Sequence, residues 1–350
     1  MKTLIVGGGL SGLALAERLD AEGQDFLLLE ARARFGGRIK TQQSGTAPFD
    51  MGPAWFWPGQ PRIAGLLDRL GLEKFDQYAT GDLLFEDEHG HVQRGVGFAS
   101  MQGSWRLVGG LATLTHALAE RITEARRRRN AHVTALQQIG NACIARLADG
   151  TREEGDQVVL AMPPRLAARI EFSPALPPQA VHTMQSVSTW MAGQAKAVAL
   201  YDTPFWRDAG LSGDGMSRRG PLVELHDASP AAGGPFALFG FIGVPPPART
   251  DEPALRQAVE AQLVRLFGPD AAGPKTLFLK DWAFDPLTAT EADAAPQHTH
   301  PHYGLPSALD GLWDGRLIFA GSEVAARFGG YLEGALEAAE HALAAAVAAG

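Results

Sequence analysis

Three glycines near the amino terminus have the spacing of a loop that holds a phosphate chain. Gly7, Gly9 and Gly12 form a G-x-G-x-x-G pattern between a short apolar run, Thr3–Val6, and an amphipathic stretch, Leu13–Ala21. Gly7 can make a tight turn, Gly9 can let the backbone approach a pyrophosphate, and Gly12 can let helix and strand pack closely. The free N–H groups at the start of the helix would then face the phosphates.

An acidic residue closes this unit at the expected distance. Phe26–Leu29 is a second apolar run and Glu30 follows it, so strand, glycine turn, helix, strand and acid fit within about 30 residues. A carboxylate at this position can accept hydrogen bonds from both ribose hydroxyls and would repel a 2′-phosphate. The pattern predicts binding of FAD or NAD and disfavours NADP.

A second glycine-rich segment distinguishes these two dinucleotides. Arg32 and Gly36-Gly37-Arg38 follow Glu30 and lead to Asp50-Met51-Gly52. A nicotinamide dehydrogenase has no need of this segment, and the remaining alternative is a surface loop with incidental arginines. An extended flavin needs a second approach of the backbone along its pyrophosphate and ribityl chain, where Arg38 can supply a positive charge. FAD is therefore the predicted cofactor.

Lys196 is a candidate catalytic residue because of its surroundings. Gly193–Tyr201 is typical of a strand that is apolar on both faces, with Val198 and Leu200 on the face of Lys196. A charged amine inside such a strand costs free energy unless it is partnered or used, and burial lowers its pKa. The alternative is a lysine that extends its amine to the surface.

Together these segments resemble the flavin-dependent amine oxidases, the group of monoamine and polyamine oxidases. The resemblance runs from Lys2 to about Leu343, and Pro53 departs from it because the family commonly carries a second glycine there. Its motifs are Gly7–Gly12, Glu30, Gly36–Arg38, Asp50–Gly52, Gly109–Leu111, Val158–Pro163, Ala195–Val198, Trp282, Phe319–Glu323 and Gly330–Ala335. Carotenoid desaturases and protoporphyrinogen oxidase share several of them, so the motifs indicate the superfamily fold more strongly than the substrate.

The resemblance implies a set of flavin-binding residues. They are Gly7, Gly9, Leu10, Ser11, Gly12, Glu30, Ala31, Arg32, Gly37, Arg38, Pro53, Ala54, Val133, Gly321, Glu323, Tyr331 and Leu332. Glu323 is expected to orient the ribityl region, and the amino terminus of the last helix, from Tyr331 to Ala348, to stabilise negative charge developing at flavin N1. The loop near Ala292 lacks the cysteine that tethers flavin in some relatives, so the FAD is expected to be non-covalent.

Three residues are expected to be catalytic by the same resemblance: Lys196, Tyr331 and Trp282. Lys196 would make a water-bridged contact to flavin N5, and Trp282 precedes the substrate-side loop. Tyr331 would form one wall of an aromatic cage that orients the amine. The second cage aromatic is missing from residues 292–295, so the cage is either incomplete or rebuilt by another residue such as Phe328 or Tyr303.

The expected architecture is α/β, with a discontinuous Rossmann-type FAD-binding domain and a second mixed-sheet α+β substrate domain. The FAD-binding domain would comprise residues 1–55, 105–162 and 307–350, and the substrate domain residues 56–104 and 163–306. The chain is short for the family, and the missing length is expected to come from the substrate domain. A shallower or more open pocket would follow.

The predicted function is oxidation of an amine to an imine, by hydride transfer to flavin N5 with O2 as acceptor. The alternative is a flavoprotein that oxidises a different bond. It would be a desaturase or dehydrogenase acting on a non-amine substrate, or a renalase-like oxidase of a dihydronicotinamide. Lys196 and Gly330–Ala335 favour the amine oxidase, whereas the short substrate domain and the incomplete cage favour the alternative. A flavin-binding module without turnover is a third possibility.

Composition and short sequence features indicate whether the protein binds nucleic acid, membranes or metal ions. The net charge of −8 argues against a nucleic-acid binder, and Arg126–Arg129 is expected to end a helix. The single cysteine, Cys143, is expected in the core and indicates a reducing compartment. With no signal peptide and an uncharged run of only Ala342–Gly350, a cytoplasmic protein without membrane contact is expected. The alternating His298, His300 and His302 are expected to form a pocket-rim loop and to bind no metal.

Overall fold

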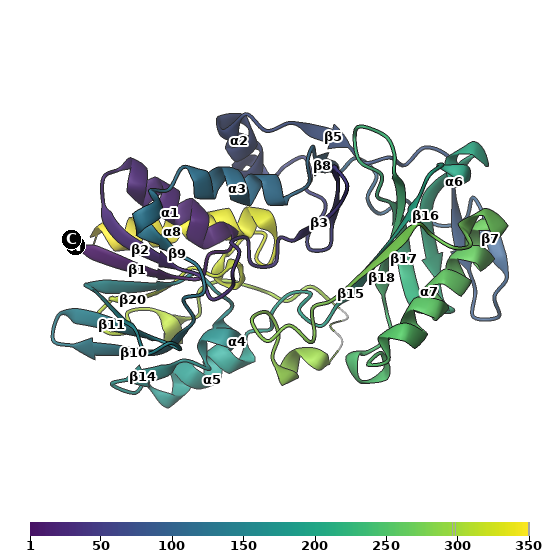
Figure 1. Ribbon diagram of the computed structural model, residues 1–350. Helices are drawn as coiled ribbons and strands as arrows, with labels where there is room; N and C mark the ends of the chain where they lie inside the picture. Colours follow the sequence, from purple (N-terminus) through teal and green to yellow (C-terminus); the bar gives the residue numbers. More distant parts are fainter. Residues whose placement is uncertain (296, 298, 349–350) are drawn as a thin grey trace.

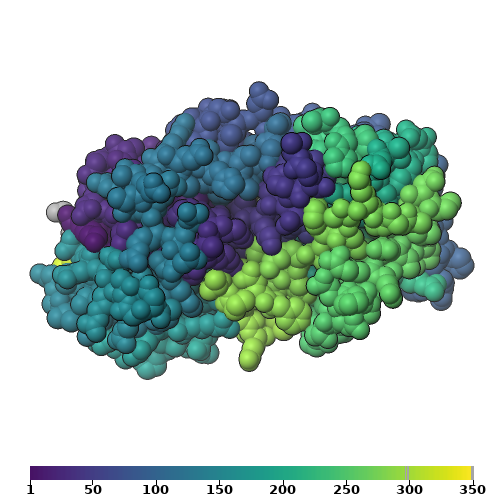
Figure 2. Space-filling view, in the orientation of Figure 1, coloured from purple at the N-terminus to yellow at the C-terminus, as the bar shows by residue number. Residues whose placement is uncertain are grey.

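Two sheets of different make-up organise the chain. The computed structural model describes residues 1–295, 297 and 299–348. In Figure 1 a parallel sheet with helices above it forms a first lobe, and a long twisted sheet with the helix α7 (Glu252–Phe267) along its outer face forms a second lobe. The segment that follows β19 (Thr276–Asp281) lies at the surface between the lobes and is yellow-green in Figure 2.

The first lobe is built on a five-stranded sheet with the order β20-β13-β1-β2-β9, all parallel. Its strands are β1 (Lys2–Val6), β2 (Asp25–Leu29), β9 (Arg127–Arg128), β13 (Gln157–Leu160) and β20 (Leu317–Phe319). One face is covered by α1 (Leu10–Ala21), α3 (Ala112–Glu120) and α8 (Leu332–Ala348), as Figure 1 shows. A four-stranded sheet covers the other: β10 (Val133–Ile139), β11 (Ala142–Leu147), β12 (Arg152–Gly155) and β14 (Glu171–Ser173).

Alternation along the strands explains this sandwich. Ile5 and Leu28 belong to the core beneath the helices, whereas Leu4 and Leu27 belong to the core against the four-stranded sheet. Successive side chains of a strand point to opposite faces, so a central parallel strand must be apolar throughout. Cys143 on β11 lies in the second of these cores with 0% exposure, as expected.

The second lobe is a seven-stranded sheet with the order β19-β15-β18-β17-β16-β6-β7. Its strands are β6 (Asp82–Glu86), β7 (Val92–Arg94), β15 (Ala195–Tyr201), β16 (Leu211–Ser217), β17 (Leu222–Asp227), β18 (Phe236–Ile242) and β19 (Thr276–Asp281), and α7 (Glu252–Phe267) covers one face. Ala197 and Ala199 face α7, whereas Val198 and Leu200 face the first lobe. The predicted strand around Lys196 is confirmed, with every residue of β15 buried.

Smaller elements complete the lobes. They are the strands β3 (Thr41–Ser44), β4 (Ala47–Asp50), β5 (Lys74–Asp76) and β8 (Trp105–Leu107), the helices α2 (Pro61–Leu70), α4 (Pro164–Ala167), α5 (Pro178–Ser186) and α6 (Phe205–Asp208), and 3-10 turns at Glu124–Arg126, Pro246–Ala248, Pro269–Ala271, Glu291–Ala294, Ser307–Leu309 and Ser322–Val324. Helix α8 begins at Leu332, one residue after the expected start.

Two segments that the predicted limits give to the substrate domain pack on the first lobe. Helix α2 places Ile63, Leu66 and Leu67 in the core beneath the helices. Strand β14 pairs in parallel with β10, and α5 places Ala180 and Met184 in the core against the four-stranded sheet. These contacts are long-range, which is why motif spacing alone did not reveal them.

The expectation that Arg126–Arg129 end a helix is wrong. Helix α3 ends at Glu120, and Arg126 ends a separate 3-10 turn. Arg127 and Arg128 then form β9, the edge strand beside β2. An edge strand tolerates charge because one side of its backbone has no sheet neighbour.

Replacing Gly12 with alanine is expected to destabilise the first lobe. An added Cβ would lie 1.9 Å from the Gly7 carbonyl oxygen and 3.1 Å from the Cβ of Ala161. Over-packing of this kind costs roughly 1–3 kcal/mol, and urea unfolding measures it. The matched control is Gly65→Ala on α2, where a Cβ meets no atom within 4 Å and the helix gains up to about 1 kcal/mol. A G12A variant as stable as the wild type would contradict this packing.

Candidate active site

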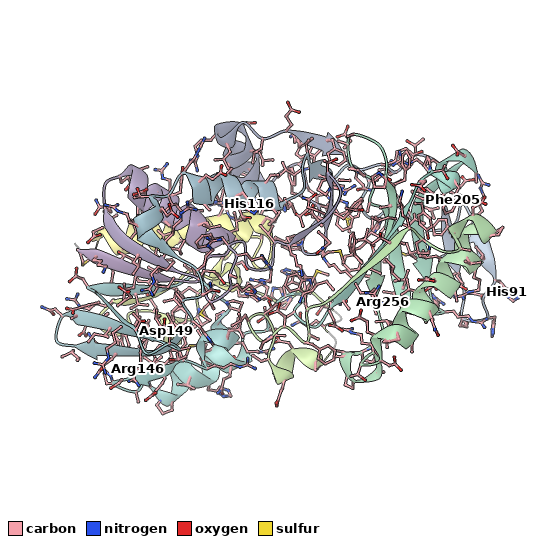
Figure 3. All side chains as sticks on the ribbon, in the orientation of Figure 1. His91, His116, Arg146, Asp149, Phe205 and Arg256 are labelled. Atoms are coloured by element: carbon pink, nitrogen blue, oxygen red, sulfur yellow. The ribbon has the colours of Figure 1, made fainter. Side chains whose placement is uncertain are left out.

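A cavity of about 990 Å³ lies between the two lobes. Most of the residues expected at the site line it: Gly7, Gly9, Leu10, Ser11, Glu30, Ala31, Arg32, Gly37, Arg38, Pro53, Ala54, Val133, Lys196, Trp282, Gly321, Tyr331 and Leu332. Gly12 and Glu323 do not line it. Figure 3 shows Arg146 and Asp149 toward one end of the molecule and His91 and Phe205 toward the other, and none of the four lines the cavity.

The glycine turn after β1 exposes its backbone to the cavity. Gly7 has a φ of +111°, and an added Cβ would meet the Ala161 carbonyl oxygen at 2.5 Å. A Cβ on Gly9 would meet no atom within 4 Å, so this residue borders open space. The second glycine segment packs directly against the first, since Gly36 N–H donates to the Gly8 carbonyl at 2.8 Å. Two glycine backbones thus approach the same space, as a dinucleotide pyrophosphate requires.

Glu30 directly follows β2, with its side chain buried at the cavity wall. One carboxylate oxygen accepts from Gly8 N–H at 2.8 Å and the other from Arg32 N–H at 2.7 Å. These bonds fix the carboxylate and leave each oxygen a further lone pair for a hydroxyl donor. The Arg32 guanidinium instead donates to Asp285 at 2.7 Å and to Thr288 at 2.9 Å.

Glu323 acts through Arg38. Arg38 donates to Glu323 at 2.6 Å and to Ser322 Oγ at 3.0 Å, and Glu323 is fully buried. Burial alone would lower the pKa of Arg38, but the Glu323 carboxylate raises it overall. Arg38 therefore stays protonated at the cavity wall, within an ion pair whose net charge is zero.

Lys196 is the buried amine that the sequence indicates, at 4% exposure. Its Nζ donates to the carbonyl of Gly52, in the segment after β4, and lies 5.1 Å from the ring centroid of Phe241. Burial lowers the pKa of Lys196 from 10.5 to about 8, partly offset by the Asp50 carboxylate. Burial also raises the pKa of Asp50 to about 6. Lys196 can therefore change its protonation state close to neutral pH.

The aromatic wall differs from the expected cage. Tyr331 lines the cavity and stacks on His300, with ring centroids 4.9 Å apart and planes at 14°. Phe328 is 42% exposed and Tyr303 donates its hydroxyl to the Ser188 carbonyl, and neither lines the cavity. Of the two alternatives for the cage, neither Phe328 nor Tyr303 is placed to rebuild it. The aromatic residues that line the cavity with Tyr331 are Trp55, Trp57, Trp190, Phe241 and Trp282.

Trp282 holds the segment after β4. Its indole Nε1 donates to the Met51 carbonyl at 2.9 Å, and the side chain is 3% exposed. Met51 and Gly52 thus offer adjacent carbonyls to Trp282 and Lys196 of the second lobe. Trp282 therefore contributes an aromatic surface to the cavity and also fixes the position of the segment after β4.

Several cavity residues were missed by the sequence analysis. Trp55 and Trp57 follow closely after Pro53, a predicted flavin contact. Their position in the sequence could therefore have indicated that they lie near the flavin site. Phe241 and Glu224 gave none, because they reach the cavity through strand pairing with distant β15. Trp190 lies in a loop before β15 without a motif of its own.

Among the described residues no group of three or more His, Cys, Asp or Glu side chains could hold a metal ion. His298 lies outside the described residues, and His300 contacts the Gly329 carbonyl at 3.0 Å through Nε2. In the same part of the chain, no helix is long and apolar enough to cross a membrane.

Comparison with known proteins agrees with this geometry. The family model described as flavin containing amine oxidoreductase matches residues 10–97 and 80–347. The chain belongs to this family. Amine oxidoreductases of the family carry a flavin, and the glycine backbones, Glu30 and Arg38 described above fit such a cofactor.

Individual relatives cover nearly the whole chain. The probable flavin-containing monoamine oxidase A of Dictyostelium discoideum is 25% identical, over 95% of this chain and 94% of the relative. Putrescine oxidase of Kocuria rosea is 23% identical, over 99% and 95%. The D. discoideum alignment spans 441 positions, more than the 350 residues of this chain, so the relative carries segments that this amine oxidoreductase lacks.

Solved structures confirm the fold class. Wild-type putrescine oxidase bound to putrescine matches with a TM-score of 0.83 at 21% identity, covering 99% of both chains. Cyclohexylamine oxidase from Brevibacterium oxydans IH-35A matches with a TM-score of 0.83 at 21% identity, covering 98% of both. The chain is an α/β flavoprotein oxidoreductase with a Rossmann-type FAD-binding domain and a second, substrate domain.

Lys196→Met is expected to stabilise the folded amine oxidoreductase below pH 8. Because burial lowers the pKa of Lys196 from 10.5 to about 8, the unfolded chain binds this proton more tightly than the folded one. The penalty to the folded state is fully present below pH 8 and is relieved as the pH rises to 10.5. At about 1.4 kcal/mol per pKa unit it amounts to roughly 3 kcal/mol.

The free energy of unfolding in urea, measured at several pH values between 7 and 10.5, checks this expectation. The stability gap between K196M and wild type should shrink through this window. Lys275→Met is the matched control, because the side chain of Lys275 is 62% exposed and should give no comparable change. A gap that does not vary with pH would contradict a buried, titrating amine.

Proposed function

We propose that the protein oxidises a small-molecule amine, using non-covalent FAD as cofactor and O2 as electron acceptor. The observation that carries the proposal is one cavity with two kinds of wall. The first lobe contributes glycine backbones, Glu30 and Arg38, and the second lobe contributes the buried amine of Lys196 among aromatic rings.

The first lobe has the groups needed to hold the dinucleotide. The backbones of Gly9 and Gly37 would lie along the pyrophosphate, whose charge Arg38 would balance. Glu30 would accept from ribose hydroxyls with its remaining lone pairs. Leu332 starts α8 at the cavity wall, so the helix dipole would favour negative charge on the ring system.

The second lobe and α8 have the groups needed to orient an amine. When bound, the flavin supplies the redox chemistry: it accepts a hydride from the carbon next to the amine nitrogen and passes the electrons to O2, giving an imine and hydrogen peroxide. The faces of Tyr331 and Trp190 would guide the amine. The apolar walls exclude water and favour the neutral amine. Lys196, with its lowered pKa, can hold or release a proton near the reacting carbon.

Anaerobic stopped-flow spectroscopy tests the proposal. Primary and secondary amines, amino acids and reduced nicotinamides are mixed separately with the purified flavoprotein, and bleaching of the flavin is followed. We expect bleaching by an amine, with hydrogen peroxide released when air is readmitted. Bleaching by a dihydronicotinamide or a C–C substrate alone would overturn the proposal in favour of the non-amine alternative.

A substitution links this activity to the cavity. Lys196→Met should lower the rate of amine oxidation about 10²-fold, the usual contribution of a positioned acid or base. Lys275→Met serves again as the exposed control. Unchanged turnover in K196M would remove Lys196 from the catalytic assignment and leave the flavin assignment intact.

The mode of flavin attachment has its own test. The only cysteine of the chain, Cys143, is buried on β11 and does not line the cavity. Precipitation with trichloroacetic acid should therefore release all of the flavin into the supernatant, with the absorbance of FAD. Yellow colour retained in the washed pellet would disprove non-covalent binding.

A cytoplasmic location is part of the proposal. It is supported by the single cysteine, which is free and buried, so no internal disulfide stabilises the fold. A tagged copy expressed in its own cells should fractionate with cytoplasmic enzymes.

A further inference from the structure

A histidine stands behind the tyrosine of the cavity wall. The ring of His300 stacks on that of Tyr331, with centroids 4.9 Å apart and planes at 14°. Its Nε2 donates to the carbonyl of Gly329, two residues before the tyrosine, at 3.0 Å. Tyr331 lines the cavity whereas His300 does not. The imidazole therefore supports the tyrosine from outside the cavity.

Two further aromatic rings hold this histidine. Trp190 meets the ring of His300 with centroids 4.6 Å apart and planes at 62°, and Tyr303 meets it at 5.4 Å and 87°. The Tyr303 hydroxyl donates to the Ser188 carbonyl at 2.7 Å, which ties residues 299–303 to the segment that carries Trp190. Edge-to-face contacts at these distances are favourable. The plane of the imidazole is thus fixed, although His300 is exposed at the surface.

The turn before Tyr331 is shaped to receive these rings. A Cβ on Gly329 would collide with the side chain of Tyr303. A Cβ on Gly330 would lie 2.8 Å from the Cβ of Trp190, and Gly330 has a φ of +79°, which side chains with a Cβ rarely adopt. Larger residues at the two glycines would push the aromatic rings away. The close approach of the rings to the turn therefore depends on both glycines.

The orientation of the Tyr331 ring is what the histidine can control. The backbone of Tyr331 is already fixed, because its N–H donates to the Phe328 carbonyl at 3.0 Å and α8 follows directly. Its side chain keeps two rotatable bonds, which stacking on His300 restricts. A wall that orients a substrate must hold its groups within about 0.5 Å of the productive geometry. A misplacement of about 1 Å can cost about 10²-fold in rate.

We propose that His300 is a positioning residue that holds the ring of Tyr331 in the plane that guides the amine. Trp190 and Tyr303 hold His300 in turn. The inference rests on the proposed amine oxidation and adds to it a residue that does not touch the substrate. The stacked ring carries the effect, and the hydrogen bond to Gly329 anchors the histidine to the turn.

Steady-state kinetics with the amine that wild type oxidises fastest test this role. His300→Ala should lower kcat/KM about tenfold, as a partial misplacement of Tyr331 would. His300→Phe keeps a ring for stacking and should stay within about threefold of wild type. His300→Gln keeps a hydrogen-bond donor without a ring and should fall as far as H300A.

The matched control for these variants is His182→Ala on α5, because His182 is also an exposed histidine. Equal flavin content in all variants checks their folding. A kcat/KM of H300A equal to that of wild type overturns the proposal. So does an H300F variant that is no more active than H300A.

A double substitution tests whether His300 acts through Tyr331. Tyr331→Leu removes the ring that the histidine supports. On this background His300→Ala should change kcat/KM less than about twofold, because residues that act as one unit have non-additive effects. A further tenfold loss in the double variant would show that His300 acts elsewhere and would overturn the assignment.

Nuclear magnetic resonance reports the contact without turnover. The chain has four tyrosines, so holoprotein with ring-¹³C tyrosine gives a sparse spectrum, and the signal lost in Tyr331→Leu identifies Tyr331. His300→Ala should move this signal, and His182→Ala should leave it in place. An unmoved signal in H300A overturns the inference. If no amine bleaches the flavin, the proposed function fails, and this comparison still decides whether His300 holds Tyr331.

Discussion

Two adjacent backbone carbonyls hold the site together. Trp282 donates to Met51 and Lys196 donates to Gly52, so side chains of the second lobe end on a turn of the first. The turn is itself tightly packed, since a Cβ on Gly52 would lie 2.0 Å from the Arg38 carbonyl oxygen. The cavity, the burial of Lys196 and the approach of Arg38 all depend on this junction.

The junction also sets the electrostatics of the cavity. On the side of the first lobe, Arg38 is fixed by fully buried Glu323 and carries a permanent positive charge. On the other side, burial of Lys196 lowers its pKa from 10.5 to about 8. Beyond Phe241, Glu224 adds a carboxylate to the cavity wall. The first lobe thus contributes a guanidinium to this wall, and the second lobe contributes an amine and a carboxylate.

Much of the first lobe could be predicted from the sequence, because its signals are local. The turn Gly7–Gly12 and the acid Glu30 have fixed spacing. In the second lobe, Lys196 could also be predicted, because it stands out as a charge in an apolar run. The aromatic wall could not be predicted in the same way. Phe241 and Glu224 reach the cavity only through long-range strand pairing, and Trp190 through a loop. Arg127 and Arg128 were wrongly predicted to end a helix, because charged residues are typical of helix ends and of edge strands alike.

Strand β15 is paired on both sides, by β18 and β19. Its alignment against the first lobe is therefore independent of β6 and β7 at the far edge of the sheet. Segments can be added to or trimmed from that edge without shifting the lysine that faces Gly52. The far edge of the sheet can therefore vary in length while the part of the cavity wall built on β15 stays in place, and a chain of 350 residues keeps the fold of the solved structures it resembles.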